Sequence, residues 1–151
     1  MTGVFGVQWS GIGACGALIQ GNLVGTQWSS NTALRMITDG TSNTFLAGEK
    51  HVPMTMFGRA KVGDGSIYNG VWTTYSGRVA GLDDPPAKGP KDVTASTNGD
   101  AFFARKFGSY HPGVTQFVMC DGSIKTVRVS INLQMYERFA LIADGQVVSD
   151  E

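Results

Sequence analysis

The chain has 151 residues, the length of one domain, and 42% of them are hydrophobic, so a core can form without a metal or a disulfide. Its 12 basic and 12 acidic residues cancel and only 16% of residues are charged, which excludes the basic surface of a nucleic-acid-binding protein and the composition of a disordered chain. Glycine stands out with 21 residues, about twice its usual share of ~7%. We expect a single domain over residues 1–151 with many short strands and tight turns.

The N-terminal part of the chain predicts short elements. Residues 1–30 are glycine-rich and uncharged, a pattern that favours short strands and turns over a helix. Asn31 or Thr32 is expected to cap a single helical turn over 33–37, which Asp39-Gly40 ends. No apolar run approaches the ~18 residues of a membrane-spanning helix, and no basic region of a signal peptide precedes the first apolar residues. We therefore expect neither a membrane span nor a targeting signal in this chain.

The middle of the chain combines two strand signals with a long segment that shows no periodicity. Residues 44–47 predict a short buried strand, and residues 66–75 predict a second one. Residues 77–100 contain prolines and glycines that disfavour a central strand. We expect residues 77–100 to form a long surface loop, and loops of this length often carry function.

The last fifty residues begin with a hairpin signal. Residues 114–119 and 123–129 predict two strands joined at Asp121-Gly122, because Asp-Gly readily adopts the positive φ of a tight hairpin. Lys125 and Arg128 indicate that one face of the second strand is exposed to water.

A helix is expected after this hairpin. Residues 133–142 carry apolar side chains at helical spacing, and Ser130 or Asn132 is expected to cap the helix. With the strands above, this helix predicts an α+β domain that is built on an antiparallel β-sheet and has few helices.

Short oxygen-bearing side chains gather between Asp39 and Thr44. One interpretation is an oxygen cage for Ca²⁺, completed by Glu49 or Asp121. The other is a polar turn in which Asp39, Ser42 and Asn43 satisfy backbone groups of their own loop. We favour the turn, because the spacing does not match the twelve-residue calcium loop. We expect no cofactor, and calcium at Asp39 or Asp121 stays open.

His111 lies just before the predicted hairpin. One interpretation makes it a general base that Asp121 orients, as in a hydrolase. The other is a structural histidine whose ring ties the loop to a neighbouring carbonyl or carboxylate. Ser109 and Ser123 lie in no known nucleophile motif, and a catalytic site needs more converging groups than these. We therefore favour the structural role and expect no enzymatic activity.

Two further groups of residues leave alternatives open. Four aromatic residues form a sugar-stacking platform in one interpretation and core or interface residues in the other: Trp9, Trp28, Trp72 and Tyr75. Cys15 and Cys120 permit either one disulfide or two buried thiols.

Several of these motifs together resemble a known family. The run Asp39-Gly40-Thr41-Ser42-Asn43-Thr44, followed by Gly48-Glu49-Lys50, resembles the central motif of a large family of unknown function. That family is abundant in planctomycetes and has also been labelled solute-binding-like. The arrangement of His111, nine further residues and Asp121-Gly122 resembles its C-terminal signature, and residues 131–148 resemble its ending. The matching motifs occur in the family's order and cover roughly residues 31–50 and 107–148.

The resemblance implies a pilin-like protein. Members of the family typically begin with a prepilin-type leader and a long hydrophobic helix, like type IV pilins and the pseudopilins of type II secretion, and a β-rich globular head follows. We expect this chain to be such a head without the leader and helix. The resemblance also implies a location in the cell envelope or outside the cell.

In this interpretation a set of motif residues locks adjacent loops together: Asp39, Gly40, Ser42, Asn43, Glu49, His111, Asp121 and Gly122. The expected function is non-enzymatic assembly or contact with partners, namely other pilin-like subunits or envelope proteins. Two alternatives are an extracellular solute- or glycan-binding module and a structural protein that self-assembles through exposed strand edges.

Overall fold

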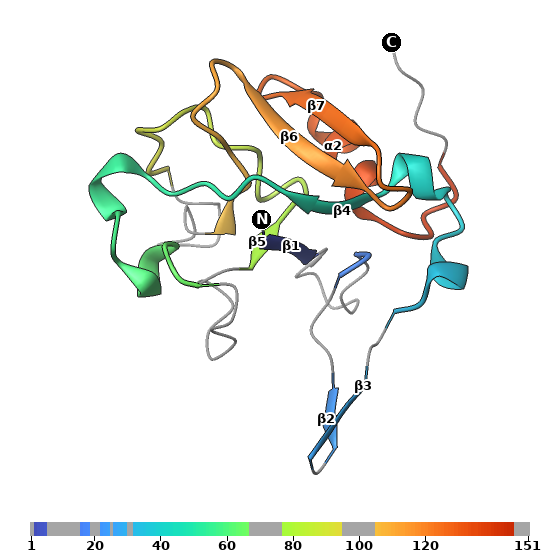
Figure 1. The fold of residues 1–151 in the computed structure, drawn as a ribbon. Coiled ribbons are helices and arrows are strands. Elements are labelled where there is room, and N and C mark those ends of the chain that lie inside the picture. Colours follow the sequence, from blue (N-terminus) through green and yellow to red (C-terminus); the bar gives the residue numbers. More distant parts are fainter. Residues whose placement is uncertain are drawn as a thin grey trace.

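The computed structural model describes residues 2–5, 16–18, 22–24, 26–29, 32–66, 77–94 and 105–146. Among these residues five strands form one sheet in the order β5-β1-β4-β6-β7 (Figure 1). The strands are β1 (Thr2–Phe5), β4 (Phe45–Gly48), β5 (Arg78–Val79), β6 (Val114–Met119) and β7 (Ile124–Arg128). A separate antiparallel hairpin joins β2 (Asn22–Val24) to β3 (Gln27–Ser29).

The sheet confirms the predicted α+β class and adds one parallel pair. The pairs β1–β4, β4–β6 and β6–β7 are antiparallel. Only β5 runs parallel to its neighbour β1, with Val4 opposite Arg78. The short strands within 1–30 that the glycine-rich composition predicts are present as β1, β2 and β3.

The C-terminal half follows the sequence prediction closely. Strand β6 has the predicted bounds, and β7 is one residue shorter at each end than 123–129. The helix α2 spans Leu133–Ala140, and the side chain of Asn132 caps it by accepting hydrogen bonds from the backbone N–H groups of Gln134 and Met135. Asn132 and not Ser130 is therefore the cap. The helix ends two residues before the predicted Ile142 because Leu141 adopts an extended backbone conformation.

Short 3₁₀ turns connect these elements: η1 (Leu34–Met36), η2 (Thr41–Asn43), η3 (Met54–Met56) and η4 (Ala60–Val62). The predicted turn over 33–37 is present as η1, but its predicted cap is wrong. Ala33 occupies the N-cap position without a side-chain hydrogen bond. The hydroxyl of Thr32 instead donates to the carbonyl of Ala17, 15 residues earlier, and Asn31 lies outside the described residues.

The core forms where α2 packs against one face of the sheet, behind β6 and β7 in Figure 1. The Phe45 ring of β4 stacks on Phe117 of β6 at a centroid distance of 4.0 Å. From α2, Tyr136 and Phe139 approach the Phe45 ring at 5.8 and 5.1 Å. These two residues lie three apart on the helix, so their side chains share one face. Aromatic packing therefore fixes the position of the helix on the sheet.

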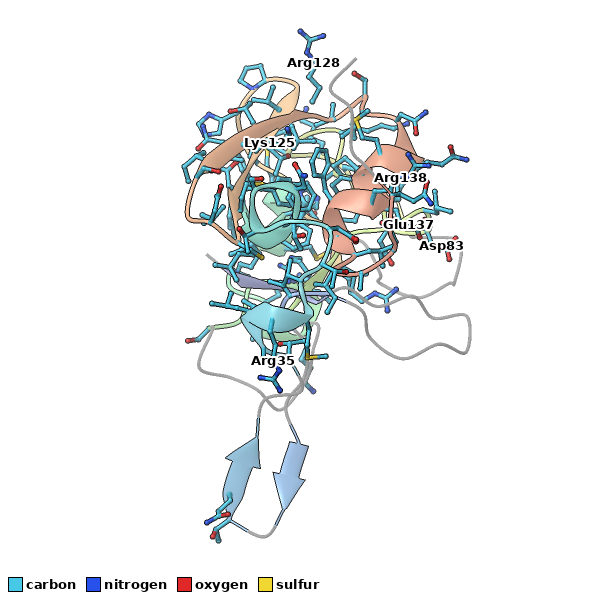
Figure 2. All side chains as sticks on the ribbon, turned by 90° about the vertical axis from the view of Figure 1, so that its right-hand side faces the viewer. Arg35, Asp83, Lys125, Arg128, Glu137 and Arg138 are labelled. Carbon is cyan, nitrogen blue, oxygen red and sulfur yellow. The ribbon has the colours of Figure 1, made fainter. Side chains whose placement is uncertain are left out.

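Charged side chains lie around this core on the side that Figure 2 faces. Lys125 of β7 places its ammonium group 4.6 Å from the centroid of the Phe139 ring. Glu137 and Arg138 of α2 and Arg128 of β7 are labelled on the same side of the molecule. The exposed face predicted for the second hairpin strand is present and includes Arg128, but the placement of Lys125 on it is wrong, because Lys125 is half-buried on the opposite face, which also carries the buried Val127.

The segment 77–100 differs from the predicted surface loop. Its first residues form β5, and Arg78, Val79 and Ala80 are buried. Asp84 is also buried and forms an ion pair with Arg105 at 3.2 Å. The local pattern does not reveal this burial because a two-residue strand has no measurable period and its partner β1 lies more than 70 residues earlier. Residues 95–100, and the strand predicted within 66–75 from residue 67 on, lie outside the described residues.

No helix among the described residues is both long enough and apolar enough to cross a membrane.

Candidate functional site

Asp39 connects the start of the central motif to the chain that follows α2. Its two carboxylate oxygens accept hydrogen bonds from the backbone N–H groups of Asp144, at 2.7 Å, and Gly145, at 3.0 Å. Beside them the Thr38 N–H donates to the carbonyl of Ile142 at 2.8 Å. We call these contacts the Asp39 clasp. The clasp joins segments more than 100 residues apart in the sequence.

The rest of the central motif packs against the β6–β7 turn. Gly40 has a φ of 98°, a conformation that L side chains rarely adopt. The side-chain amide of Asn43 donates to the carbonyl of Asp39 at 3.3 Å, while Ser42 is exposed. On the other side of the loop, the Cys120 N–H donates to the Thr44 carbonyl at 2.9 Å.

The Asp121-Gly122 turn completes this cluster. Its backbone is tied to the central motif, because the Asp121 N–H donates to the carbonyl of Thr41 at 3.1 Å. One carboxylate oxygen of Asp121 accepts from both the hydroxyl and the N–H of Ser123, at 2.7 and 2.9 Å, and these bonds lower the pKa of Asp121. Gly122 has a φ of 88°, the left-handed conformation expected for this corner.

A second cluster holds Glu49 and His111. Glu49 accepts the N–H of Gln116 at 2.7 Å with one carboxylate oxygen, and its other oxygen lies 3.4 Å from Nε2 of His111. Ser109 shapes the same loop, since its hydroxyl accepts the His111 N–H and donates to the carbonyl of Val114. Nε2 of His111 therefore lies within ion-pair distance of a carboxylate, and its structural role stays a prediction.

The pairing of His111 with Asp121, on which the hydrolase interpretation depended, is wrong. His111 precedes β6 and Asp121 follows it, so the two side chains lie at opposite ends of a six-residue strand, roughly 20 Å apart at ~3.4 Å per residue. Strand β4 runs antiparallel to β6, so Glu49 at its exit comes to lie near His111. The motif residues therefore form two clusters, one at each end of β6.

The described residues contain no group of three or more His, Cys, Asp or Glu side chains that could hold a metal ion. Asp39 directs both carboxylate oxygens to backbone N–H groups and Asp121 directs one to Ser123. Calcium at Asp39 or Asp121 stays a prediction that binding measurements have to test.

Replacing Asp39 by alanine is expected to lower the free energy of unfolding by about 1–3 kcal/mol, because two backbone N–H groups lose a charged acceptor. Asp39→Asn keeps one acceptor oxygen, so its free energy of unfolding should fall by less than that of Asp39→Ala. Urea unfolding measures both. The matched control is Ser42→Ala in the same loop, where the exposed side chain should change stability by less than about 0.5 kcal/mol. Equal stability of the Asp39→Ala and Ser42→Ala proteins would contradict the clasp.

A buried polar network that the sequence analysis did not identify surrounds Asp92. His51 is almost fully buried and its Nε2 donates to the backbone carbonyl of Asp92 at 2.7 Å. The carboxylate of Asp92 accepts from the backbone N–H of Lys88 at 2.9 Å, from the N–H and hydroxyl of Thr94, and lies 3.6 Å from Nζ of Lys106. Although burial raises the pKa of Asp92, these hydrogen bonds and Lys106 outweigh it and lower the pKa to about 2.

The low pKa of Asp92 predicts a loss of stability in acid. In the unfolded chain the carboxylate has its usual pKa of 3.8, so between about pH 4 and pH 2 the unfolded state binds more protons than the folded one. The stabilisation by ionised Asp92 is therefore present above about pH 4 and is lost as the pH falls toward 2. Thermal unfolding across this pH range should show a smaller decrease in melting temperature for Asp92→Asn than for the wild-type protein. The control Ser42→Ala, at an exposed side chain that does not ionise in this range, should follow the wild type. Parallel curves for Asp92→Asn and wild type would contradict this role.

Arg78 forms the other buried polar centre. Its side chain is 0% exposed, and its guanidinium donates to the carbonyls of Gly77, His51 and Gly63 at 2.7, 3.0 and 2.6 Å. Burial lowers the pKa of Arg78 to about 9, and Asp64 opposes this shift, so the side chain is charged at neutral pH. Arg78 thus ties β5 to the segments around η3 and η4. No sequence signal marked it, because an isolated arginine gives no periodicity.

An exposed aromatic pair lies beside these centres. The rings of Phe57 and Tyr110 stack at a centroid distance of 5.9 Å, and the two residues are 58% and 49% exposed. The Tyr110 hydroxyl donates to the carbonyl of Val52 at 3.0 Å. After Phe57, the Gly58 N–H donates to a carboxylate oxygen of Asp64 at 2.6 Å. The Tyr110 side chain and the backbone next to Phe57 are therefore each held by a hydrogen bond.

The aromatic platform predicted from the sequence lies outside the described residues. Trp9, Trp72 and Tyr75 are not described, and neither is the side chain of Trp28. Cys120 is a half-buried free thiol, and burial, with a contribution from Asp121, raises its pKa to about 11. Cys15 is likewise outside the described residues.

Comparison with known families identifies the family of this chain. A family model described as a protein of unknown function (DUF1559), with the short name SBP_bac_10, matches residues 2–134. The match spans most of the chain, and the protein belongs to this family. Neither the curated proteins nor the solved structures contain a significant match.

Proposed function

We propose that this protein is a non-enzymatic, pilin-like or pseudopilin-like head that acts at the cell surface or in the periplasm by contacting partner proteins. The partners in this proposal are other pilin-like subunits or envelope proteins. Membership of the family of unknown function is compatible with this role. The observation that carries the proposal is the exposed, anchored aromatic pair of Phe57 and Tyr110.

Aromatic residues of this kind are typical of contact surfaces. Phe and Tyr are enriched at protein interfaces, and Tyr is among the residues that carry most of the binding energy there. A ring that is already held in place loses little conformational entropy when a partner covers it. Tyr110 is held by its hydrogen bond to Val52, and Phe57 rests against the Tyr110 ring. The pair therefore suits a preformed point of contact.

The motif residues support a structural rather than a catalytic role. Asp39 and Glu49 direct carboxylate oxygens to backbone N–H groups, and His111 lies against Glu49. A catalytic constellation needs a nucleophile, a base and an orienting group that converge on one point. Here the candidate groups instead fasten loops at the two ends of β6.

Site-specific photo-crosslinking in the producing cells tests the proposal. A photoreactive phenylalanine analogue at position 57 should crosslink to pilin-like or envelope proteins in the envelope fraction. The same analogue at Ile124, which is 62% exposed on β7, is the matched control. Tyr110→Ser should reduce the crosslinks from position 57. Absence of the protein from envelope, periplasm and medium, or equal crosslinking from positions 57 and 124, would refute the proposal.

The second candidate function is glycan binding, and the same aromatic pair favours it. Sugar rings stack on aromatic faces, and Phe57 and Tyr110 offer the exposed rings that this requires. A ligand that binds the folded state raises the melting temperature by mass action. A glycan screen that yields a thermal shift removed by Phe57→Ser would favour this candidate over protein contact. A flat screen would count against it.

A further inference from the structure

A cleft next to the Asp92 network has a distinctive lining. Its volume is about 540 Å³, within the ~300–1,000 Å³ that is typical of small-molecule sites. The lining residues are Met54, Lys88, Gly89, Pro90, Lys91, Asp92 and Thr94. The Met54 N–H donates to the carbonyl of Pro90 at 3.0 Å, which holds η3 against the segment 88–94. Both walls of the cleft are therefore fixed to each other.

The negative charge of Asp92 in this cleft is balanced by the positive charge of Lys106. The carboxylate of Asp92 accepts hydrogen bonds from Lys88 N–H and from Thr94, and it faces the buried ammonium group of Lys106 at 3.6 Å. Lys106 also donates to the hydroxyl of Thr94 at 3.3 Å. The charges of Asp92 and Lys106 thus cancel within the wall, and Asp92 stays ionised at neutral pH because its pKa is lowered to about 2.

The remaining charge of the cleft is positive. The ammonium groups of Lys88 and Lys91 contact no carboxylate among the described residues, and both side chains are exposed. Met54 and Pro90 add apolar surface between them, and Met54 is 51% exposed. Two cations that contact no carboxylate among the described residues, beside an apolar wall, favour an anionic ligand with an apolar body.

We propose that this cleft binds small organic carboxylates that carry an apolar body. Lys88 and Lys91 attract the carboxylate, and Met54 and Pro90 contact the apolar part. The ligand class goes beyond the proposed contact function and does not depend on it, because neither Phe57 nor Tyr110 lines the cleft. Exposed charge pairs are weak individually, so the expected affinity is modest and depends on salt.

A titration followed by ¹H–¹⁵N NMR tests this binding site. The probes are 3-phenylpropionate, the neutral 3-phenylpropan-1-ol and acetate, each at low salt and at ~1 M salt, where the Debye length falls to ~3 Å. 3-Phenylpropionate should shift the amide signals of Gly89 and Thr94 with the highest affinity of the three. High salt should weaken its binding. Acetate lacks the apolar body and the alcohol lacks the charge, so both should bind more weakly.

Two variants separate the contributions of charge and apolar surface. The double variant Lys88→Gln/Lys91→Gln should bind 3-phenylpropionate about three- to tenfold more weakly and lose the salt dependence. Met54→Ala should weaken binding of 3-phenylpropionate but leave acetate unchanged. The matched control Lys61→Gln changes a lysine outside the cleft and should bind like the wild type. Circular dichroism verifies that each variant is folded.

Three results would overturn the proposal. The first is the absence of shifts at Gly89 and Thr94 with 3-phenylpropionate. The second is equal affinity for the alcohol and the acid, which would mean that the lysines do not select an anion. The third is wild-type affinity in the double lysine variant. None of these results bears on crosslinking from Phe57, so this site and the proposed contact function fail separately.

Discussion

Arg78→Met is expected to lower the free energy of unfolding by about 3–5 kcal/mol, because each buried carbonyl left without a donor costs ~1–3 kcal/mol. Methionine keeps much of the side-chain volume but donates no hydrogen bond. The carbonyls of Gly77, His51 and Gly63 would all lose their partner in the buried guanidinium. The loss of a buried charge from the core offsets part of this penalty. Urea unfolding at neutral pH measures the difference.

A surface arginine supplies the control for this substitution. Arg35 on η1 is exposed and lies away from the sheet in Figure 2. Arg35→Met should therefore change stability by less than about 0.5 kcal/mol. If Arg78→Met unfolded at the same urea concentration as Arg35→Met, the guanidinium would not hold the three segments together. Arg78→Lys keeps the charge but not the planar guanidinium, so its free energy of unfolding should lie between those of Arg78→Met and the wild-type protein.

Phe45→Ala is expected to destabilise the protein by about 3–5 kcal/mol, the usual cost of truncating a buried phenylalanine. The Phe45 ring contacts the rings of Phe117, Tyr136 and Phe139, so its loss opens a cavity between α2 and the sheet. Phe45→Leu fills part of that space and should cost less. Thermal or urea unfolding measures the series.

The position of the side chain, and not the loss of apolar surface alone, determines this effect. Ile124→Ala removes a hydrophobic side chain from the same sheet, but Ile124 is 62% exposed and its loss leaves no cavity. It should change stability by less than about 0.5 kcal/mol. A loss for Phe45→Ala no larger than that for Ile124→Ala would show that α2 does not depend on the aromatic cluster.

The motif residues form two clusters in space, and their order along the chain does not reveal which of them meet. Asp39 and Asp121 lie in neighbouring loops at one end of β6, and Glu49 and His111 meet at the other end. The less favoured interpretation of the sequence paired His111 with Asp121, yet a strand of six residues keeps the two apart. The antiparallel register between β4 and β6 places Glu49, and not Asp121, next to His111. Only strand pairing, which is a long-range property, carries that information.

The sequence by itself determined the elements whose signals are local. The Asp121-Gly122 turn and the bounds of β6 follow from backbone preferences within a few residues, whereas the choice between Ser130 and Asn132 as the helix cap came from the structure. The α+β class and the family also follow from the sequence, since short strands, the helix after the hairpin and the ordered motifs are visible in it.

Only the tertiary structure decided which distant segments meet. The parallel pairing of β5 with β1 and the contact of Asp39 with Asp144 join positions 74 and 105 residues apart, and the buried guanidinium of Arg78 reaches a carbonyl 27 residues away. Local propensity contains no signal for such contacts, because they depend on burial and on the hydrogen-bond groups that the rest of the fold leaves available. The same holds for the cleft at Lys88 and Lys91, where Met54 from another segment adds its apolar side chain to that of Pro90. Folding thus buries Arg78 and Asp84 from a segment with no readable pattern and places Lys88 and Lys91 of the same segment at the proposed ligand site.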